Sequence, residues 1–304
     1  MELNRRELEV LELVLTKKEN LTNIASALKI KKSNLSRYVK KLENCWLITE
    51  WQKGRTKIIK AESPVEFGFS QIKGEFPALK LTDILIGKTP FFLSFLKRKE
   101  QFRIADLDLP VASAKRVLTK LRNLGILNMP KRGSYGVRKE AGDIIDFTRN
   151  TLLRAYAMEG KLKFDASPMR IMGSFNSCKD IEVVIEVNRG KKAHGYWPTA
   201  YSVFHGYGVK LIMAGKFYYT NFEPELEDIL IHALVISNDT RSIAYVAALM
   251  TKNKIDYKKL LGKKQKFGIS EEFLKNLIEF VKTKGKKTFE RFPSWEEVEG
   301  VLNG

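Results

Sequence analysis

Cysteine and histidine are scarce in this sequence, and long apolar runs are absent. Two cysteines and three histidines occur among 304 residues, and none has the paired spacing of a zinc site. Cys45 and Cys178 lie in unrelated segments, so no disulfide framework is expected. No run of about 18 apolar residues predicts a membrane span, and the N-terminus begins an amphipathic pattern, not a signal peptide. We therefore expect a cytoplasmic protein without metal or cofactor.

Most sequence signatures of catalysis are also missing. No GxxxxGK[ST] phosphate loop and no GxSxG elbow occurs. In MGSFNSCKDIEVVIEV, Gly173-Ser174 precedes Asp180 and Glu182. This pattern resembles nucleotidyltransferases, in which a Gly-Ser turn holds phosphate and two carboxylates on one strand hold Mg²⁺. The segment between turn and carboxylates is shorter than in that family and no third carboxylate is identified, so we expect no enzyme, with a Mg²⁺-dependent nucleotidyltransferase as the alternative.

Positive charge is abundant and unevenly distributed. Lysine and arginine number 54 against 35 acidic residues, a formal net charge of +19. Residues 1–140 hold 29 basic and 15 acidic side chains, whereas residues 141–304 hold 25 and 20. A basic surface attracts a polyanion, because neutralised phosphates release their condensed counterions. The N-terminal half is therefore the candidate for nucleic-acid binding.

Residues 4–60, the first copy, have the pattern of three helices and a hairpin. Apolar residues at helical spacing predict a helix over residues 8–15. Asn20 is placed to cap a second helix over 21–28, and Ser33 to cap a third, with Leu35, Tyr38, Val39 and Leu42 as its buried stripe. Residues 46–48 read as a strand, and residues 49–60 as a hairpin with Lys53-Gly54-Arg55 at its tip.

Residues 82–138, the second copy, repeat this pattern at a constant offset of 79 positions. Arg37 corresponds to Arg116, Gly54 to Gly133, and Leu47-Ile48 to Ile126-Leu127. Asp108 followed by Pro110 predicts the start of its third helix. A gapless register through helix, turn, helix and hairpin indicates an internal repeat.

A short helix, a tight turn, a helix with one polar basic face and a basic hairpin follow one another in a winged helix-turn-helix. The segment LTNIASALKIKKSNLSRYVKKLENCWLITEWQKGRTKIIKAES resembles winged-helix transcription regulators of the MarR and ArsR type, which implies sequence-specific binding of double-stranded DNA. The polar helix faces would meet base edges, and the hairpins would hold phosphates. The predicted DNA-facing residues are Ser33, Asn34, Ser36, Arg37, Lys40, Lys41, Lys53 and Arg55 in the first copy and Ser113, Lys115, Arg116, Lys120, Arg122, Lys131 and Arg132 in the second.

The expected fold class is α+β, with domains at residues 1–62 and 82–141, a linker at 63–81 and a C-terminal α+β domain at 142–304. In that domain, alternation over 181–187 predicts a half-buried strand, and helices are expected over 226–236, 240–250, 255–261 and 271–282, with a last helix capped by Ser294.

The segment PELEDILIHALVISNDTRSIAYVAALMTKNKIDYKKLLGKKQKFGI resembles abortive-infection type IV antitoxins and archaeal proteins allied to nucleotidyltransferases. The resemblance implies dimerisation, or contact with a cognate toxin, by the C-terminal domain. A ligand-sensing role is also open. Two other classes remain alternatives for the whole chain: a plasmid replication initiator with tandem winged helices, and an adaptor that binds a basal transcription factor.

Overall fold

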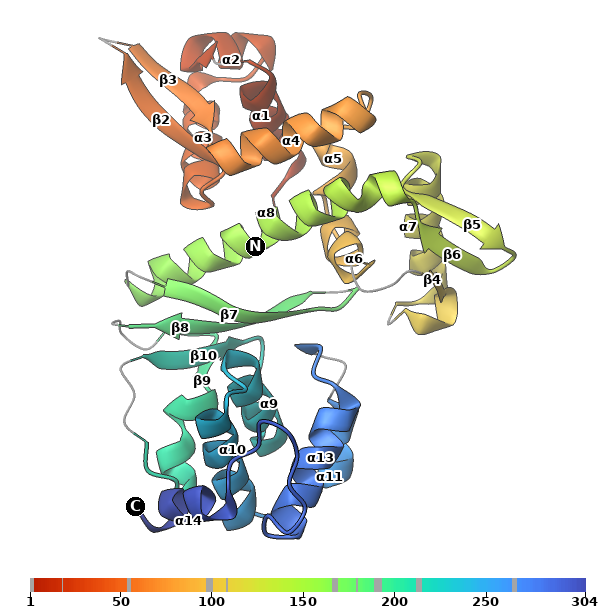
Figure 1. Ribbon diagram of the computed structural model, residues 1–304. Coiled ribbons are helices and arrows are strands. Elements are labelled where there is room, and N and C mark those ends of the chain that lie inside the picture. The colour runs from red at the N-terminus through yellow and green to blue at the C-terminus, as the bar shows by residue number, and fades with distance from the viewer. Residues whose placement is uncertain are drawn as a thin grey trace. The chain divides into compact units, whose positions relative to one another are not determined.

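The computed structural model describes residues 3–17, 19–53, 56–96, 101–107, 109–165, 169–178, 180–188, 193–211, 215–263 and 267–304. It combines helices with three separate sheets, which confirms the mixed α and β content (Figure 1). The chain forms an N-terminal unit, Met1–Glu159 with Asn176–Ile181, and a C-terminal unit, Gly160–Phe175 with Glu182–Gly304. The division falls within α8 (Gly142–Phe164), later than the expected boundary at residue 142.

The first copy consists of three helices and three strands: α1 (Arg5–Thr16), β1 (Glu19–Asn20), α2 (Leu21–Ala27), α3 (Lys32–Asn44), β2 (Ile48–Lys53) and β3 (Thr56–Ala61). Asn20 caps α2 as predicted, because its Oδ1 accepts a bond of 2.9 Å from the Asn23 amide. The predicted cap at Ser33 is wrong. α3 begins at Lys32, two residues earlier than a cap at Ser33 implies, with Lys31 at the cap position and no side-chain capping bond.

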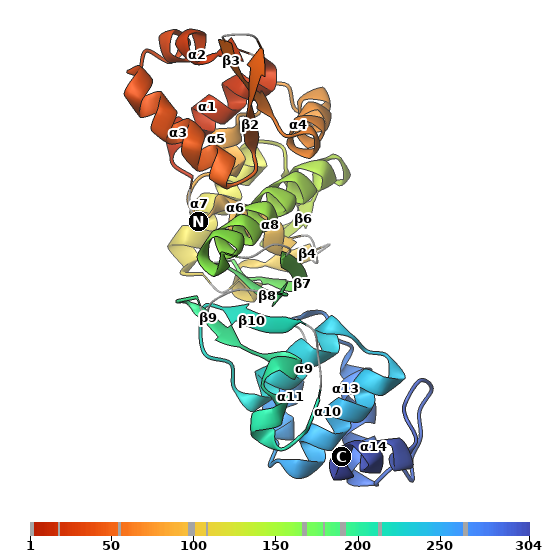
Figure 2. The ribbon, with the colours of Figure 1, turned by 90° about the vertical axis from the view of Figure 1, so that its left-hand side faces the viewer.

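The strands of the first copy form an antiparallel sheet in the order β1-β3-β2, beside the three packed helices (Figure 2). The predicted strand over 46–48 is wrong at its first two residues. Trp46 adopts a left-handed backbone with φ of 54°, and β2 starts at Ile48. The hairpin tip at residues 54 and 55 lies outside the described residues.

The second copy has a similar order of elements, but two helices precede its first strand and a 3-10 turn stands in place of the second helix. It contains α5 (Leu81–Ile84), α6 (Thr89–Leu96), β4 (Gln101–Arg103), the 3-10 turn η1 (Ile104–Asp106), α7 (Val111–Asn123), β5 (Leu127–Lys131) and β6 (Ser134–Val137). The sheet order is β4-β6-β5, with the first strand beside the last, as in the first copy. Pro110 occupies the cap position of α7, and Asp108 lies outside the described residues.

The register of the third helices agrees residue by residue. α3 and α7 each span 13 residues and start 79 positions apart. Their buried positions correspond, and each helix ends with the same backbone bond: Leu47 N to Leu42 O at 3.1 Å, and Ile126 N to Leu121 O at 3.0 Å. The left-handed residue after α3, Trp46, corresponds to Gly125, with φ of 74°. The offset of 79 positions is therefore kept through α3 and α7 and the residues that follow each helix.

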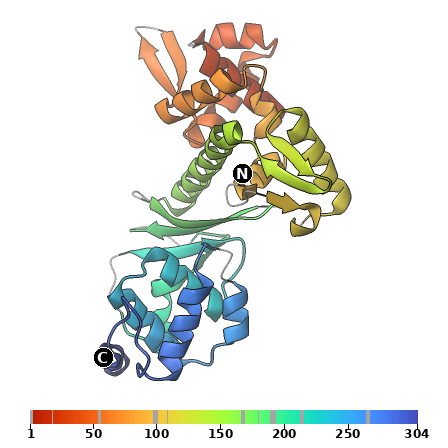
Figure 3. The same cartoon turned by 45° about the vertical axis from the view of Figure 1, so that its right-hand side comes forward.

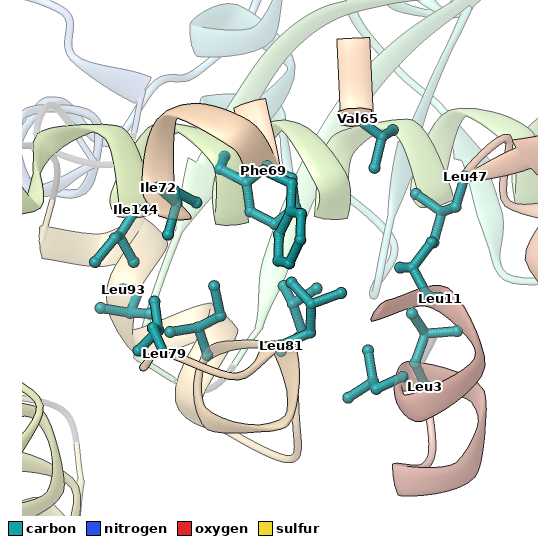
Figure 4. Close-up of a cluster of buried hydrophobic side chains, with 14 of the residues drawn as sticks. Leu3, Leu11, Leu47, Val65, Phe69, Ile72, Leu79, Leu81, Leu93 and Ile144 are labelled. Carbon is teal, nitrogen blue, oxygen red and sulfur yellow. The ribbon is translucent and has the colours of Figure 1, made fainter. Parts of the chain in front are cut away.

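The segment expected to be a linker, 63–81, is mostly helical. α4 (Ser63–Glu75) has proline in its first turn, where no helical hydrogen bond is lost, and it buries Val65, Phe69 and Ile72. These side chains lie between Leu11 and Leu47 of the first copy on one side and residues of the second copy on the other (Figure 4). Both copies, α4 and the N-terminal part of α8 thus share one hydrophobic core.

A polar contact adds to this shared core. Glu12 of α1 accepts a bond of 3.0 Å from the backbone amide of Leu81, at the start of α5. Lys73 of α4 lies 3.4 Å from the Glu12 carboxylate and donates to the Leu79 carbonyl at 2.6 Å. The carboxylate therefore connects elements of both copies through α4, and the copies are not joined by a flexible tether.

Gly68 allows α4 to approach α8 closely. A Cβ at Gly68 would lie 2.9 Å from Cδ2 of the buried Phe147 ring. We expect Gly68→Ala to destabilise the protein by about 1–3 kcal/mol, because that ring has to move in a packed core. Gly74→Ala in the same helix is the matched control, since nothing lies within 4 Å of its Cβ position. Thermal unfolding of both variants tests the packing, and equal melting temperatures would contradict it.

The C-terminal unit contains a four-stranded antiparallel sheet in the order β7-β8-β10-β9. Its strands are β7 (Met169–Asn176), β8 (Ile181–Val187), β9 (Tyr196–Pro198) and β10 (Lys216–Thr220). The helices of this unit lie on one face of the sheet (Figure 3). They are η3 (Ala200–Ser202), η4 (Phe204–Tyr207), α9 (Leu226–Ile236), α10 (Thr240–Lys252), α11 (Tyr257–Gly262), α13 (Glu271–Lys282) and α14 (Trp295–Asn303).

The sequence-based elements of this unit agree well with the structure. Ile181, Val183, Ile185 and Val187 are buried in β8, and Ser294 caps α14 by accepting a bond from the Glu297 amide. All four other predicted helices are present within two residues of their expected ends. In the described part of the chain, no helix has both the length and the apolar character needed to cross a membrane.

Candidate nucleic-acid interface

The outward face of α3 carries most of the predicted contact residues of the first copy. Ser33, Asn34, Ser36, Arg37 and Lys40 are exposed, while Leu35, Val39 and Leu42 pack inward. The Ser36 hydroxyl donates to the Lys32 carbonyl at 3.0 Å, and the Arg37 guanidinium lies 5.5 Å from the Tyr38 ring centroid. Within the described residues neither Arg37 nor Lys40 forms an ion pair. Their charges are therefore available to an anion.

α7 presents a similar face at the equivalent positions. Ser113, Lys115, Arg116 and Arg122 are exposed, and none of the three cations has an ion-pair partner in the described part of the chain. Val111, at the start of α7, is 58% exposed. An exposed apolar side chain beside cations suits contact with a thymine methyl group or a sugar. Its exposure could not be deduced from the sequence.

Lys41 and Lys120 differ from the other predicted contact residues. They occupy the same position in the two copies, and both are half-buried. The Lys41 ammonium lies 2.8 Å from the carboxylate of Glu7, a buried residue of α1. Burial lowers the pKa of Lys120, and the nearby Asp83 carboxylate of α5 opposes that shift. Both lysines therefore face the first helix of their copy and are poorly placed to meet DNA.

Lys40 and Lys41 form a matched pair for a test of this assignment. Lys41→Ala should lower the free energy of unfolding by about 1–3 kcal/mol, because Glu7 would remain buried without its cation. Lys40→Ala should leave stability unchanged and weaken DNA binding. Chemical denaturation combined with a DNA titration measures both effects. The assignment is wrong if the two variants have the same stability.

The hairpins that follow α3 and α7 differ in detail. Lys53 ends β2, but its side chain and all of Arg55 lie outside the described part of the chain. Lys57 of β3 pairs with Glu50 at 2.8 Å, and this bond raises the pKa of the lysine. Trp51, opposite Ile58 in the sheet, is 51% exposed. The first hairpin thus presents an aromatic side chain that the sequence pattern did not single out.

The second hairpin, β5–β6, has exposed cations at its tip. Lys131 and Arg132 are both exposed, and Gly133 makes the turn with φ of 79°. Within the N-terminal unit, the two hairpins point away from each other (Figure 1). Each recognition-helix candidate therefore has its own hairpin, and the two hairpins do not form one surface.

The nucleotidyltransferase alternative finds little support in the local geometry. Gly173 and Ser174 do not form the expected turn, because both lie inside β7, where a Cβ at Gly173 would be 2.3 Å from Val235. Asp180 precedes β8, and its Oδ1 accepts bonds from the Tyr156 hydroxyl at 2.6 Å and the Ile181 amide at 2.7 Å. The carboxylate is thus used in local structure. No cluster of three potential metal ligands occurs among the described residues.

Comparison with known proteins identifies a domain in the C-terminal unit. Residues 193–303 match the family described as HVO_2833_C, C-terminal. No curated protein matches the chain. No solved structure matches it. The family match covers β9, β10 and the helices that follow, so this part of the chain is similar to a domain found in other proteins, whereas the DNA-binding candidates lie outside the match.

Proposed function

We propose that this protein is a sequence-specific transcription regulator that binds double-stranded DNA through two tandem winged helix-turn-helix domains. One observation carries the proposal. Two copies of the same chain of elements, 79 positions apart, each expose the polar face of a 13-residue helix followed by a hairpin. The exposed cations Arg37, Lys40, Lys115, Arg116 and Arg122 have no ion-pair partners among the described residues, as expected of side chains that bind phosphates and base edges.

α3 and α7 are the recognition helices in this proposal. Arg37 and Arg116 occupy equivalent positions near the middle of each exposed face, where a guanidinium can donate two bonds to guanine O6 and N7. Ser33, Asn34, Ser36, Ser113 and Lys115 lie on the N-terminal turns, which enter the groove first in helix-turn-helix proteins. Lys40, Arg122, Lys131 and Arg132 would bind phosphates. Lys41 and Lys120 are assigned to stability.

The C-terminal unit is proposed to dimerise, or to bind a protein partner, without catalysing a reaction. Its match to a family seen in other proteins supports a separable role. The local use of Asp180 and the strand conformation of Gly173 argue against phosphate and Mg²⁺ chemistry at that segment.

Selection of bound duplexes from a random DNA pool tests the proposal directly. The purified full chain should enrich one motif with two half-sites, because each recognition helix presents about three or four side chains to base edges. Mapping the motif in the genome separates the alternatives: promoters indicate a regulator, and repeated sites at an origin indicate a replication initiator. Absence of any enriched sequence would overturn the proposal and favour the protein-interaction adaptor.

A further inference from the structure

One segment of the C-terminal unit concentrates positive charge. Residues 252–287 contain twelve lysines, no arginine and four acidic residues. The rest of residues 141–304 holds thirteen basic and sixteen acidic side chains, so it is slightly negative. The entire positive excess of this half of the chain therefore comes from a segment of 36 residues, which the family match includes.

The fold brings the two ends of this segment together. α11 and α13 pack against each other (Figure 1), and the Lys282 ammonium, at the end of α13, lies 4.8 Å from the ring centroid of Tyr257, at the start of α11. Lys254 and Lys258 flank Tyr257, and Lys284 and Lys286 follow Lys282 in the chain. All of these lysines are exposed. We call these five side chains the lysine patch: Lys254, Lys258, Lys282, Lys284 and Lys286.

The loop that carries Lys284 and Lys286 is held in place. The Gly285 amide donates to the Phe280 carbonyl at 3.0 Å, and the Thr283 hydroxyl donates to the Glu279 carbonyl at 2.8 Å. Gly285 has φ of 72°, and a Cβ there would lie 2.6 Å from Trp295. The backbone that carries Lys284 and Lys286 is thus fixed at the end of α13, directly after Lys282.

Ion pairing does not explain the lysine patch, and the helix dipole favours only Lys282, in the last turn of α13. Other lysines of the segment are paired: Lys259 and Lys263 contact Glu225, Lys275 contacts Glu271, and Lys287 contacts Glu279. The patch lysines have no ion-pair partner among the described residues, although the exposed Asp256 lies between Lys254 and Lys258 and caps α11. Cations near a helix N-terminus oppose the helix dipole, so Lys258 does not stabilise α11.

We propose that the lysine patch binds the phosphate backbone of duplex DNA without reading its sequence. Lysine is a flexible point charge suited to phosphates, whereas arginine, the usual base reader, is absent from the segment. An anionic membrane is the less favoured partner. Interfacial surfaces carry apolar side chains beside their cations, and no large hydrophobic residue among the described part of 252–287 is exposed. This binding lies outside the two recognition helices and needs no base contact.

The test compares two variants of the full chain with equal loss of charge. The patch variant carries Lys254→Gln, Lys258→Gln and Lys284→Gln, and the control carries Lys163→Gln, Lys210→Gln and Lys216→Gln, which are exposed lysines outside the patch. Affinity is measured for random-sequence duplexes of about 20 and 60 base pairs over a range of salt concentrations. On the long duplex, the patch variant should bind about tenfold or more weakly than the control, with a salt slope smaller by about two.

Equal affinity and equal salt slope of the two variants on the long duplex would overturn the proposal. Binding of both variants to vesicles that contain anionic phospholipid is measured in parallel. If the patch variant loses affinity for the vesicles but not for DNA, the proposal is overturned in favour of a membrane partner. The result is independent of the proposed function, because the affinity for random-sequence DNA measures binding to the phosphate backbone and not recognition of bases. If the full chain selects a motif but the patch variant binds random DNA as well as the control does, only the role of the lysine patch is refuted. If the patch variant binds more weakly but no motif is selected, only sequence-specific recognition is refuted.

Discussion

The affinity of the protein for its duplex site is expected to fall by about 10³–10⁵-fold as salt rises from about 50 to 200 mM. The physical reason is counterion release, which scales with the number of phosphates that cations neutralise. Seven of the proposed contact residues are exposed cations without ion-pair partners among the described residues: Arg37, Lys40, Lys115, Arg116, Arg122, Lys131 and Arg132. Fluorescence anisotropy of a labelled duplex, titrated at several salt concentrations, measures this slope.

An affinity that stays constant over the same salt range would exclude a phosphate-dominated interface. Removing one phosphate contact gives an internal control. Lys131→Ala should reduce the salt slope by about one and weaken all sequences alike. Lys57→Ala is the matched control, because that hairpin lysine is already paired with Glu50 and should change the slope less.

Insertion of base pairs between the two half-sites is expected to reduce affinity by about 10²–10⁴-fold, since the second domain then loses its intramolecular advantage. The copies share one core through α4, and Glu12 of α1 binds the amide of Leu81 in α5. α3 and α7 therefore keep one separation and one relative orientation. Two helices in a fixed arrangement cannot both contact their half-sites when one half-site is shifted along the duplex and rotated around its axis.

Two insertion lengths distinguish a rigid pair from a flexible one. Inserting about 5 base pairs rotates one half-site to the opposite side of the duplex, and inserting about 10 restores its face at a greater distance. Both duplexes should bind much more weakly than the original site in an equilibrium binding assay. Recovery of affinity with the longer insertion would show that the copies move independently, against the shared core.

The repeat was predictable because periodicity and register are local properties of the sequence. The buried stripe of α3, the equivalent stripe of α7 and the helices of the C-terminal unit follow from the spacing of apolar residues. The cap at Asn20 also follows from local chemistry. Ser33 is not the cap because α3 begins at Lys32, with Lys31 in the cap position, a difference of two residues that the spacing of apolar residues does not resolve.

Long-range contacts account for the errors in the site and the linker. Lys41 lies on the edge of the polar face, and its partner Glu7 is 34 positions earlier, so no local pattern distinguishes it from Lys40. Pro64 and two glycines led us to predict a linker over residues 63–81. In the structure the proline occupies the first turn of α4, and Gly68 lies against the Phe147 ring, where a Cβ would be too close. Ile144 and Phe147 complete the same core, so a fragment ending at residue 142 would expose it.

Replacement of Arg37 and of Arg116 by alanine tests most directly whether α3 and α7 read bases. Each variant should lose about 1–3 kcal/mol of binding free energy on the selected duplex and much less on random DNA, because a guanidinium that contacts a base edge discriminates among sequences. Repeating the selection with each variant should relax the motif in one half-site only. Equal losses on selected and random DNA, with an unchanged motif, would contradict base recognition by these helices.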